Sequence, residues 1–365
     1  MRLAVFADLH LDRQFSWAGP DLARRRRQAL RDVARRIAEL AVSQRCDALC
    51  CAGDLYEQER FSSDTGALLR QLFADLSPMP VLLAPGNHDW YGPASLYQTV
   101  EWTPNVTCFT GQTLEPKELC DGLTIWGSAH GAPSGTRNFL EGFTVGRGGV
   151  NLALFHGSEV SGLPYEGDQK IGHAPFKASE IVDSGLRHAL VGHYHGPRDE
   201  DDYTYPGNPD PLTFGESGER GVVIVDLDED GTVQRSRHRV AISQVHEVEV
   251  DVGGSETRDE VRARVREALH GLAGCARVNL TGEVAPQVVF HPAELQSLDV
   301  GLDAVFVGTV RLEYAYDLDE VAAEHTVRGQ FCRDVHDSDL TDDEKERVIV
   351  TGLRAFDARD DLEVD

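Results

Sequence analysis

Short apolar runs that end in metal-ligand residue types are the feature that most constrains this chain. The first run leads into D-L-H, and later runs lead into G-D, G-N-H-D, a single histidine and G-H-Y-H. Helical patterns separate the runs, and strands that alternate with helices are typical of a sheet covered by helices. Because such a sheet gathers its functional groups at the carboxyl ends of its strands, the sequence predicts an α/β fold in which these distant residues meet. The expected strands are 3–7, 48–52, 81–84, 123–126, 152–155, 189–191 and 222–225.

The spacing inside two of these motifs predicts which side chains act together. Asp8 and His10 are two residues apart, so on an extended strand end both side chains point the same way and can meet one ion. His193 and His195 have the same spacing, and we expect both on one side of the chain. The candidate metal ligands are Asp8, His10, Asp54, Asn87, His156, His193 and His195.

The chemistry of this set points to metal binding. Oxygen and nitrogen ligands without a thiolate suit a pair of divalent ions, such as Mn, Fe or Zn, bridged by a carboxylate. Each motif alone has a plainer explanation, since an isolated D-x-H or H-x-H is often structural and an aspartate after a strand often caps a helix. All of them in one order predict a two-metal site. His130 is either a substrate contact or a packing residue, and we expect His173 and His188 to pack or to lie at the surface.

The ordered motifs resemble those of the calcineurin-like metallophosphoesterases, which read D-x-H, G-D, G-N-H-D or G-N-H-E, H and G-H-x-H. The resemblance covers residues 1 to about 227 and implies a β-sandwich flanked by helices. It implies one ion held by Asp8, His10, Asp54 and His195, and another held by Asp54, Asn87, His156 and His193. It further implies that His88 is the catalytic histidine and that Asp89 sets its tautomer.

A site of this kind hydrolyses phosphate esters. Two ions about 3.5 to 4 Å apart clamp the phosphate oxygens and stabilise charge on the attacking and leaving oxygens. One ion also lowers the pKa of a bound water, so that hydroxide is available near neutral pH. His88 can then protonate the leaving oxygen, although a purely supporting role for this side chain stays open.

Finer features point to DNA. After G-H-Y-H the chain reads YTYPGNPDPLTFGESGERGVVIVDL, which resembles the corresponding segment of SbcD-like and YhaO-like DNA-repair exonucleases. That resemblance implies a manganese-dependent nuclease, a 3'-5' exonuclease that acts on DNA ends, as a homodimer with a coiled-coil ATPase partner of the SbcC type. Glu57 stands where SbcD nucleases commonly have histidine, which leaves the strand polarity and the balance of exonuclease and endonuclease action open.

The expected organisation is a metallophosphoesterase domain followed by two smaller parts. We expect the nuclease domain over 1–242, a small α+β capping domain over 243–330 and an acidic C-terminal segment over 331–365. Such nucleases carry a capping domain in this position. Thr341 and Glu344 form a capping box that predicts a last helix.

Composition limits the function classes. The net charge of -26 argues against a simple nucleic-acid binder, but residues 1–45 hold ten Arg against five acids. Of these, Arg24, Arg25, Arg27, Arg31 and Arg35 lie along one expected helix, whose charged side is either solvated or a contact for a phosphate backbone. No apolar stretch is long enough to span a membrane, so we expect a cytoplasmic protein. Two other functions stay open: hydrolysis of a small phosphodiester or phosphomonoester, and a metal-bound scaffold without chemistry.

Overall fold

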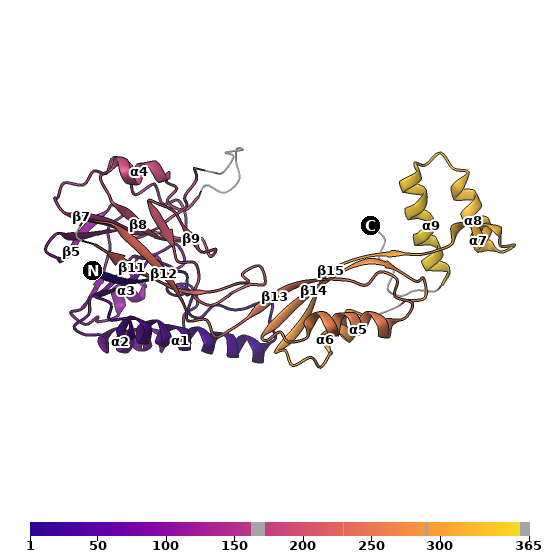
Figure 1. Ribbon diagram of the computed structural model, residues 1–365, viewed down its shortest axis with the longest axis horizontal. Helices are drawn as coiled ribbons and strands as arrows, with labels where there is room; N and C mark the ends of the chain where they lie inside the picture. The colour runs from indigo at the N-terminus through magenta and orange to yellow at the C-terminus, as the bar shows by residue number, and fades with distance from the viewer. Residues whose placement is uncertain (162–171, 229, 289–290, 358–365) are drawn as a thin grey trace. The chain divides into compact units, whose positions relative to one another are not determined.

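The structure is a computed structural model that describes the chain except for residues 162–171, 229, 289–290 and 358–365 (Figure 1). The chain forms two compact units, Met1–Gln244 and Val245–Asp365, which divide close to the expected break between residues 242 and 243. Within the described residues, no helix has the length and apolar character needed to cross a membrane.

The first unit is built on two six-stranded sheets. The strands of the first sheet, in spatial order, are β12 (Val233–Arg239), β11 (Gly221–Leu227), β1 (Arg2–Phe6), β2 (Ala48–Cys51), β3 (Val81–Leu83) and β4 (Val106–Cys108). Those of the second are β5 (Glu115–Cys120), β6 (Leu123–Gly127), β7 (Val150–His156), β8 (His188–Gly192), β10 (Tyr203–Tyr205) and β9 (Arg198–Asp199). Strands β1 to β4 are parallel, as are β6 to β8, so their carboxyl ends share an edge.

Side chains alternate between the two faces of each sheet, and both faces are buried. In β1, Leu3 and Val5 pack into the core between the sheets, whereas Ala4 and Phe6 pack against the covering helices. In β2, Cys50 faces the core between the sheets and Cys51 faces outward. This double burial explains why the strands appear in the sequence as continuous apolar runs. The result is the predicted β-sandwich flanked by helices.

Helices α1 (Pro20–Ser43) and α2 (Thr65–Ala74) cover the outer face of the first sheet (Figure 1). Leu30, Val33 and Ile37 recur at helical spacing on the buried side of α1, and burial of each stabilises the fold by about 1.5–3 kcal/mol. The short helices α3 (Leu96–Thr99) and α4 (Ala178–Asp183) complete the unit, with Ile181 of α4 packed on the outer face of the second sheet.

Several arginines of α1 are paired with nearby acids. Arg31 donates to Asp64 at 2.8 Å and Arg35 donates to Asp32 at 2.5 Å. Arg26 is buried, donates to the carbonyl of Pro211 and lies 3.8 Å from Oδ2 of Asp210. Contact between this side of α1 and a phosphate backbone stays a prediction.

The second unit holds a three-stranded parallel sheet of β13 (Val245–Asp251), β14 (Cys275–Val284) and β15 (Ala304–Tyr314). Helices α5 (Arg258–Leu269) and α6 (Pro292–Gln296) connect the strands. Three helices follow: α7 (Leu318–Ala323), α8 (Val327–His336) and α9 (Asp342–Phe356). The capping box of Thr341 and Glu344 is confirmed at the start of α9. Residue 331 lies inside α8, so the expected break after residue 330 does not fall between elements.

Candidate metal centre

The predicted ligands lie at the carboxyl ends of strands from both sheets. Asp8 and His10 follow β1, Asp54 follows β2 and Asn87 follows β3. His156 is the last residue of β7, and His193 and His195 follow β8. Ligand atoms of Asp8, His10 and His195 lie within 4.8 Å of one another, as do those of Asp8, Asp54 and His156. The structure therefore brings together groups that are far apart in the chain.

The backbone at four of the predicted ligands is wound in the left-handed sense. The φ angles are 54° at Asp8, 49° at His10, 53° at Asp54 and 108° at His193. Residues other than glycine rarely adopt such angles, and they persist where the surrounding structure enforces them, often at functional sites. The reasoning from an extended strand end is therefore wrong for the first motif, because β1 ends at Phe6 and the side chains meet through a turn.

Asp54 is the hub of the cluster. Its Oδ2 lies 3.3 Å from Nε2 of His156 and 3.6 Å from Nε2 of His10. Its Oδ1 accepts the backbone N–H of His88 at 2.8 Å. Burial alone would raise the pKa of Asp54, but His156, His10 and His88 hold the pKa well below its usual range. The carboxylate is thus ionised and shared between segments of both sheets.

Lone pairs converge next to His156. Nδ1 of His156 lies 2.9 Å from the carbonyl oxygen of Ala52, so it carries the proton and leaves Nε2 to face the cluster. That Nε2 lies 3.1 Å from Oδ1 of Asn87 and 3.3 Å from Oδ2 of Asp54, which are both acceptors. Burial disfavours the charged imidazole, yet Asp54 more than offsets this and raises the pKa of His156 to about 9. A cation, either a proton or a metal ion, is therefore favoured at this point.

His10 also shows whether the cluster fits a metal ion. Its Nδ1 lies 3.0 Å from Oε1 of Glu57, while its Nε2 is buried and has no hydrogen-bond partner among the residues that the structure describes. A buried polar atom without a partner is costly unless an ion or water satisfies it. Together with the converging acceptors of Asp54 and Asn87, this free nitrogen fits divalent metal ions.

The glycine of the G-D motif is required by close packing. Gly53 has a φ of +96°, and a Cβ at this position would lie 2.5 Å from Nδ1 of His156. Only glycine accommodates both the backbone angle and the approach of the imidazole.

The two histidines of G-H-Y-H diverge, which corrects the expectation that both lie on one side. The ring of His195 lies 5.2 Å from that of His10, and its Nε2 is 3.9 Å from Oδ1 of Asp8. The ring of His193 instead lies 5.2 Å from that of His156, while its backbone N–H donates to Asp8 at 3.2 Å. The left-handed backbone at His193 explains the divergence, because the period of two holds only for extended chain.

His88 and Asp89 have different surroundings and different roles. The His88 side chain is 39% exposed, its ring lies 4.8 Å from that of His10, and its Nδ1 lies 3.1 Å from Oε2 of Glu57. Asp89 is fully buried and accepts backbone N–H groups at 3.1 Å from Asp54 and at 2.7 Å from Leu55. The expectation that Asp89 sets the tautomer of His88 is therefore corrected: Glu57 is the carboxylate at that ring, and Asp89 fixes the loop around Asp54.

Carboxylates that the ligand prediction omitted hold the imidazoles. Glu57 meets His10 and His88 as described and also accepts from Arg13 at 2.9 Å. Glu216 lies 2.6 Å from Nδ1 of His195; burial would raise the pKa of this glutamate, but His195 lowers it to about 2. Glu57 is visible in the sequence only as a departure from the related nucleases, and nothing local marks Glu216.

The remaining histidines divide between packing and the site. His130 is fully buried, and its Nε2 lies 2.7 Å from the carbonyl oxygen of His156, so the structure gives it a packing role and excludes direct substrate contact. His188 packs as expected, with Nε2 2.9 Å from Oγ1 of Thr204. His173 was expected to pack or to lie at the surface, yet its ring lies 5.2 Å from that of His193.

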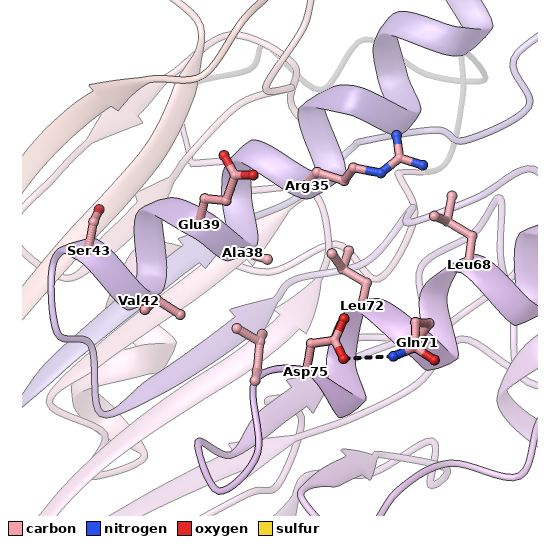
Figure 2. A pocket seen from close by; sticks show the side chains of 10 residues that line it. Arg35, Ala38, Glu39, Val42, Ser43, Leu68, Gln71, Leu72 and Asp75 are labelled. Atoms are coloured by element: carbon pink, nitrogen blue, oxygen red, sulfur yellow. Dashed lines mark hydrogen bonds between the residues drawn. The ribbon is translucent and has the colours of Figure 1, made fainter.

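A cleft of about 510 Å³ opens beside the cluster and is lined by Asn87, His88 and His173, among others. A separate groove of about 600 Å³ lies between α1 and α2, where Figure 2 shows Gln71 hydrogen-bonded to Asp75. No candidate ligand lines that groove, and nothing in the described structure indicates what would occupy it. We therefore assign the chemistry to the cleft at His88.

Known proteins resemble this chain over most of its length. YhaO of Bacillus subtilis, an uncharacterized metallophosphoesterase, is 25% identical over 366 residues, which cover 92% of this chain and 87% of that protein. The DNA double-strand break repair protein Mre11 of Methanopyrus kandleri is 27% identical over 302 residues, which cover 73% of this chain and 62% of that protein. The crystal structure of the calcineurin-like phosphoesterase YfkN from Bacillus subtilis is 14% identical, with a TM-score of 0.38 over 73% of this chain and 96% of that chain.

The sequence model described as calcineurin-like phosphoesterase matches residues 1–197, which is more than half of the chain. That span contains every candidate ligand, the motif order and the strands that carry it. This chain belongs to the calcineurin-like phosphoesterase family.

Proposed function

We propose that the protein is a two-metal phosphodiesterase that cleaves DNA, with Mn as its metal and with 3'-5' exonuclease action at strand ends. The observation that carries the metal-dependent part is the convergence of Asp54, Asn87 and His156 lone pairs beside the free Nε2 of His10. The family membership supports the same chemistry.

The ligands divide into two sets that share Asp54. One ion would be held by Asp8, His10, Asp54 and His195, and the other by Asp54, Asn87, His156 and His193. When bound, the ions supply charge to stabilise the phosphate oxygens and a water that loses its proton near neutral pH. The carboxylates Glu57 and Glu216 orient the imidazoles of His10 and His195, which leaves Nε2 of each available to hold an ion.

His88 would act on the leaving group. Its Nδ1 is engaged by Glu57, so Nε2 is the ring nitrogen available to a substrate in the cleft. An imidazole in this position can donate a proton to the leaving oxygen. Asp89 contributes indirectly, because it ties the loop after β2, which carries Asp54, to the loop after β3, which carries His88.

The DNA substrate is supported by resemblance and by the cleft. One relative, Mre11, bears the name of a DNA double-strand break repair protein, and Arg13 and Arg60 line the cleft beside His88. The second unit stands where related nucleases carry a capping domain. We extend the proposal to a homodimer that works with an SbcC-like coiled-coil ATPase, which would supply DNA affinity that a protein of net charge -26 lacks.

A second candidate is hydrolysis of a small phosphodiester or phosphomonoester. The observation that favours it is the size of the cleft, because about 510 Å³ falls within the range of small-molecule sites.

One experiment separates the two candidates. The protein is incubated with Mn and with linear DNA labelled at either end, in parallel with cyclic nucleotides and nitrophenyl phosphates. Release of labelled mononucleotides from the 3' end, lost in the His88→Ala variant and after chelation, supports the nuclease. Turnover of the small molecules alone would refute the nuclease in favour of the small-molecule enzyme.

A further inference from the structure

Two tryptophans line the cleft that exposes His88. Trp90 lies two residues after His88, and Trp17 follows the segment that begins with Asp8 and His10. Both side chains are partly exposed. The cleft therefore brings flat aromatic surfaces next to the group that would protonate a leaving oxygen, although neither tryptophan has a role in the proposed hydrolysis.

Trp17 is held in place by its surroundings. Its Nε1–H donates to the carbonyl of Leu212 at 3.0 Å, and its ring packs 4.8 Å from that of Phe214 and 6.0 Å from that of Phe15. The guanidinium of the buried Arg26 lies 5.9 Å from the same ring. An aromatic surface that is already fixed loses little conformational freedom when a ligand stacks on it.

Positive charge in the cleft is limited. Arg13 and Arg60 line it, but Arg13 already meets Glu57 at 2.9 Å, and the whole chain carries a net charge of -26. Electrostatic attraction to a phosphate backbone is therefore weak. Proteins that bind single strands combine a few cations with aromatic rings on which bases stack, and stacking does not depend on net charge.

We propose that Trp17 and Trp90 form a stacking subsite for an unpaired nucleobase of single-stranded DNA, next to the phosphate that is cleaved. This inference rests on the proposed function and adds its substrate class. A base inside a duplex has both faces covered by its neighbours and the last pair of a blunt end exposes one face, so an unpaired base offers the most stacking surface to these rings. The enzyme would therefore select single-stranded ends at the step of binding.

The test compares DNA strands that differ only in their bases. An oligothymidylate of about eight nucleotides is compared with the same strand in which the residues flanking the scissile phosphate lack a base. With the full-length protein and Mn, kcat/KM should be about tenfold to a hundredfold higher for the strand with bases. Equal values on the two strands would overturn the subsite while leaving the nuclease intact.

Substitutions of tryptophan test whether the preference for the strand with bases depends on Trp17 and Trp90. Trp17→Leu and Trp90→Leu should each move the ratio of the two kcat/KM values toward one. Trp102→Leu is the matched control, because Trp102 packs against Phe73 and does not line the cleft, and it should keep the wild-type ratio. If Trp17→Leu fails to fold, Trp90→Leu decides. Wild-type ratios in both cleft variants would refute the proposal.

A binding measurement keeps failure of the subsite distinct from failure of the proposed function. Quenching of tryptophan fluorescence is measured with the chelated protein and each strand, so that no hydrolysis is needed. Tighter binding of the strand with bases, lost in Trp90→Leu, supports the subsite even if no phosphodiester is cleaved. Equal binding of both strands would reject the subsite whatever the enzyme hydrolyses.

Discussion

The Glu57 carboxylate joins His10, a candidate metal ligand, to His88. Replacement of Glu57 by glutamine should break this connection. The carboxylate lies 3.0 Å from Nδ1 of His10 and 3.1 Å from Nδ1 of His88, and its side chain is only 15% exposed. Glutamine keeps the size and one accepting oxygen, but its amide nitrogen donates. One of the imidazoles must then move its proton from Nδ1 to Nε2 or lose its hydrogen bond.

The size of the effect follows from the bond that is lost. A hydrogen bond to a charged partner contributes about 1.5–3 kcal/mol, which corresponds to about 10- to 150-fold in an equilibrium or a rate. If His10 changes tautomer, the nitrogen that faces the ion is blocked and metal affinity falls by about 10- to 100-fold. If His88 loses the carboxylate, which raises the pKa of His88, the doubly protonated ring that donates to the leaving oxygen is less populated, and kcat falls by a similar factor while metal affinity is retained.

Three measurements distinguish these results. Mn is titrated into the chelated protein, hydrolysis of labelled DNA gives kcat and KM, and nitrogen NMR of the imidazoles reports which ring nitrogen carries the proton. Glu101→Gln is the control, because it makes the same change of charge at an exposed residue outside the lining of the cleft. Glu57→Gln with wild-type affinity, kcat and imidazole spectra would refute the reasoning.

Other substitutions and conditions test the remaining claims. Gly53→Ala forces a side chain into a φ of +96° and against His156, so it should lower the free energy of unfolding by at least about 1–3 kcal/mol in urea and reduce metal content. Asp89→Asn should lower the same free energy by about 1.5–3 kcal/mol, because a carboxylate that holds buried backbone N–H groups is lost. His88→Ala should lower it by less, because the side chain is 39% exposed and Glu57 keeps His10 and Arg13 as partners; equal losses in both would contradict the separate roles assigned to them. Added KCl should raise Tm, because salt weakens the self-repulsion of a protein with a net charge of -26. The rise should be about 2–4 °C for each kcal/mol of repulsion removed. A flat or falling Tm up to molar salt would exclude this effect.

The sequence predicted the parts of the site that depend on topology. Parallel strands place their ends at one edge, so convergence of Asp8, Asp54 and Asn87 on the first sheet followed from the order of strands and motifs, whereas the approach of His156 from the second sheet depends on how the two sheets pack. The local backbone conformation could not be predicted from this order, because the left-handed turn at Asp8 and the divergence at His193 depend on how the loops pack. The rule that side chains two residues apart point the same way holds only for an extended chain.

Contacts between loops were also beyond sequence reasoning. Glu57 reaches His10 and His88 from a third segment, and Glu216 reaches His195 from 21 positions further along the chain, beyond β9 and β10. No spacing encodes such approaches. Helices α7 and α8 were missed for a related reason, since few of their side chains are buried and the apolar period is weak; Val321 is the only buried hydrophobic residue of α7 within the described residues.

The division of the ligands between the sheets has a mechanical consequence. Asp8, Asp54 and Asn87 come from the first sheet, while His156 and His193 come from the second, so ions held by both sets would fasten one rim of the sandwich. We expect chelation to loosen that rim first, and hydrogen exchange should quicken at the loops after β1, β2 and β8 before it does in the strands. The same few side chains would then both carry out the reaction and hold the two sheets together.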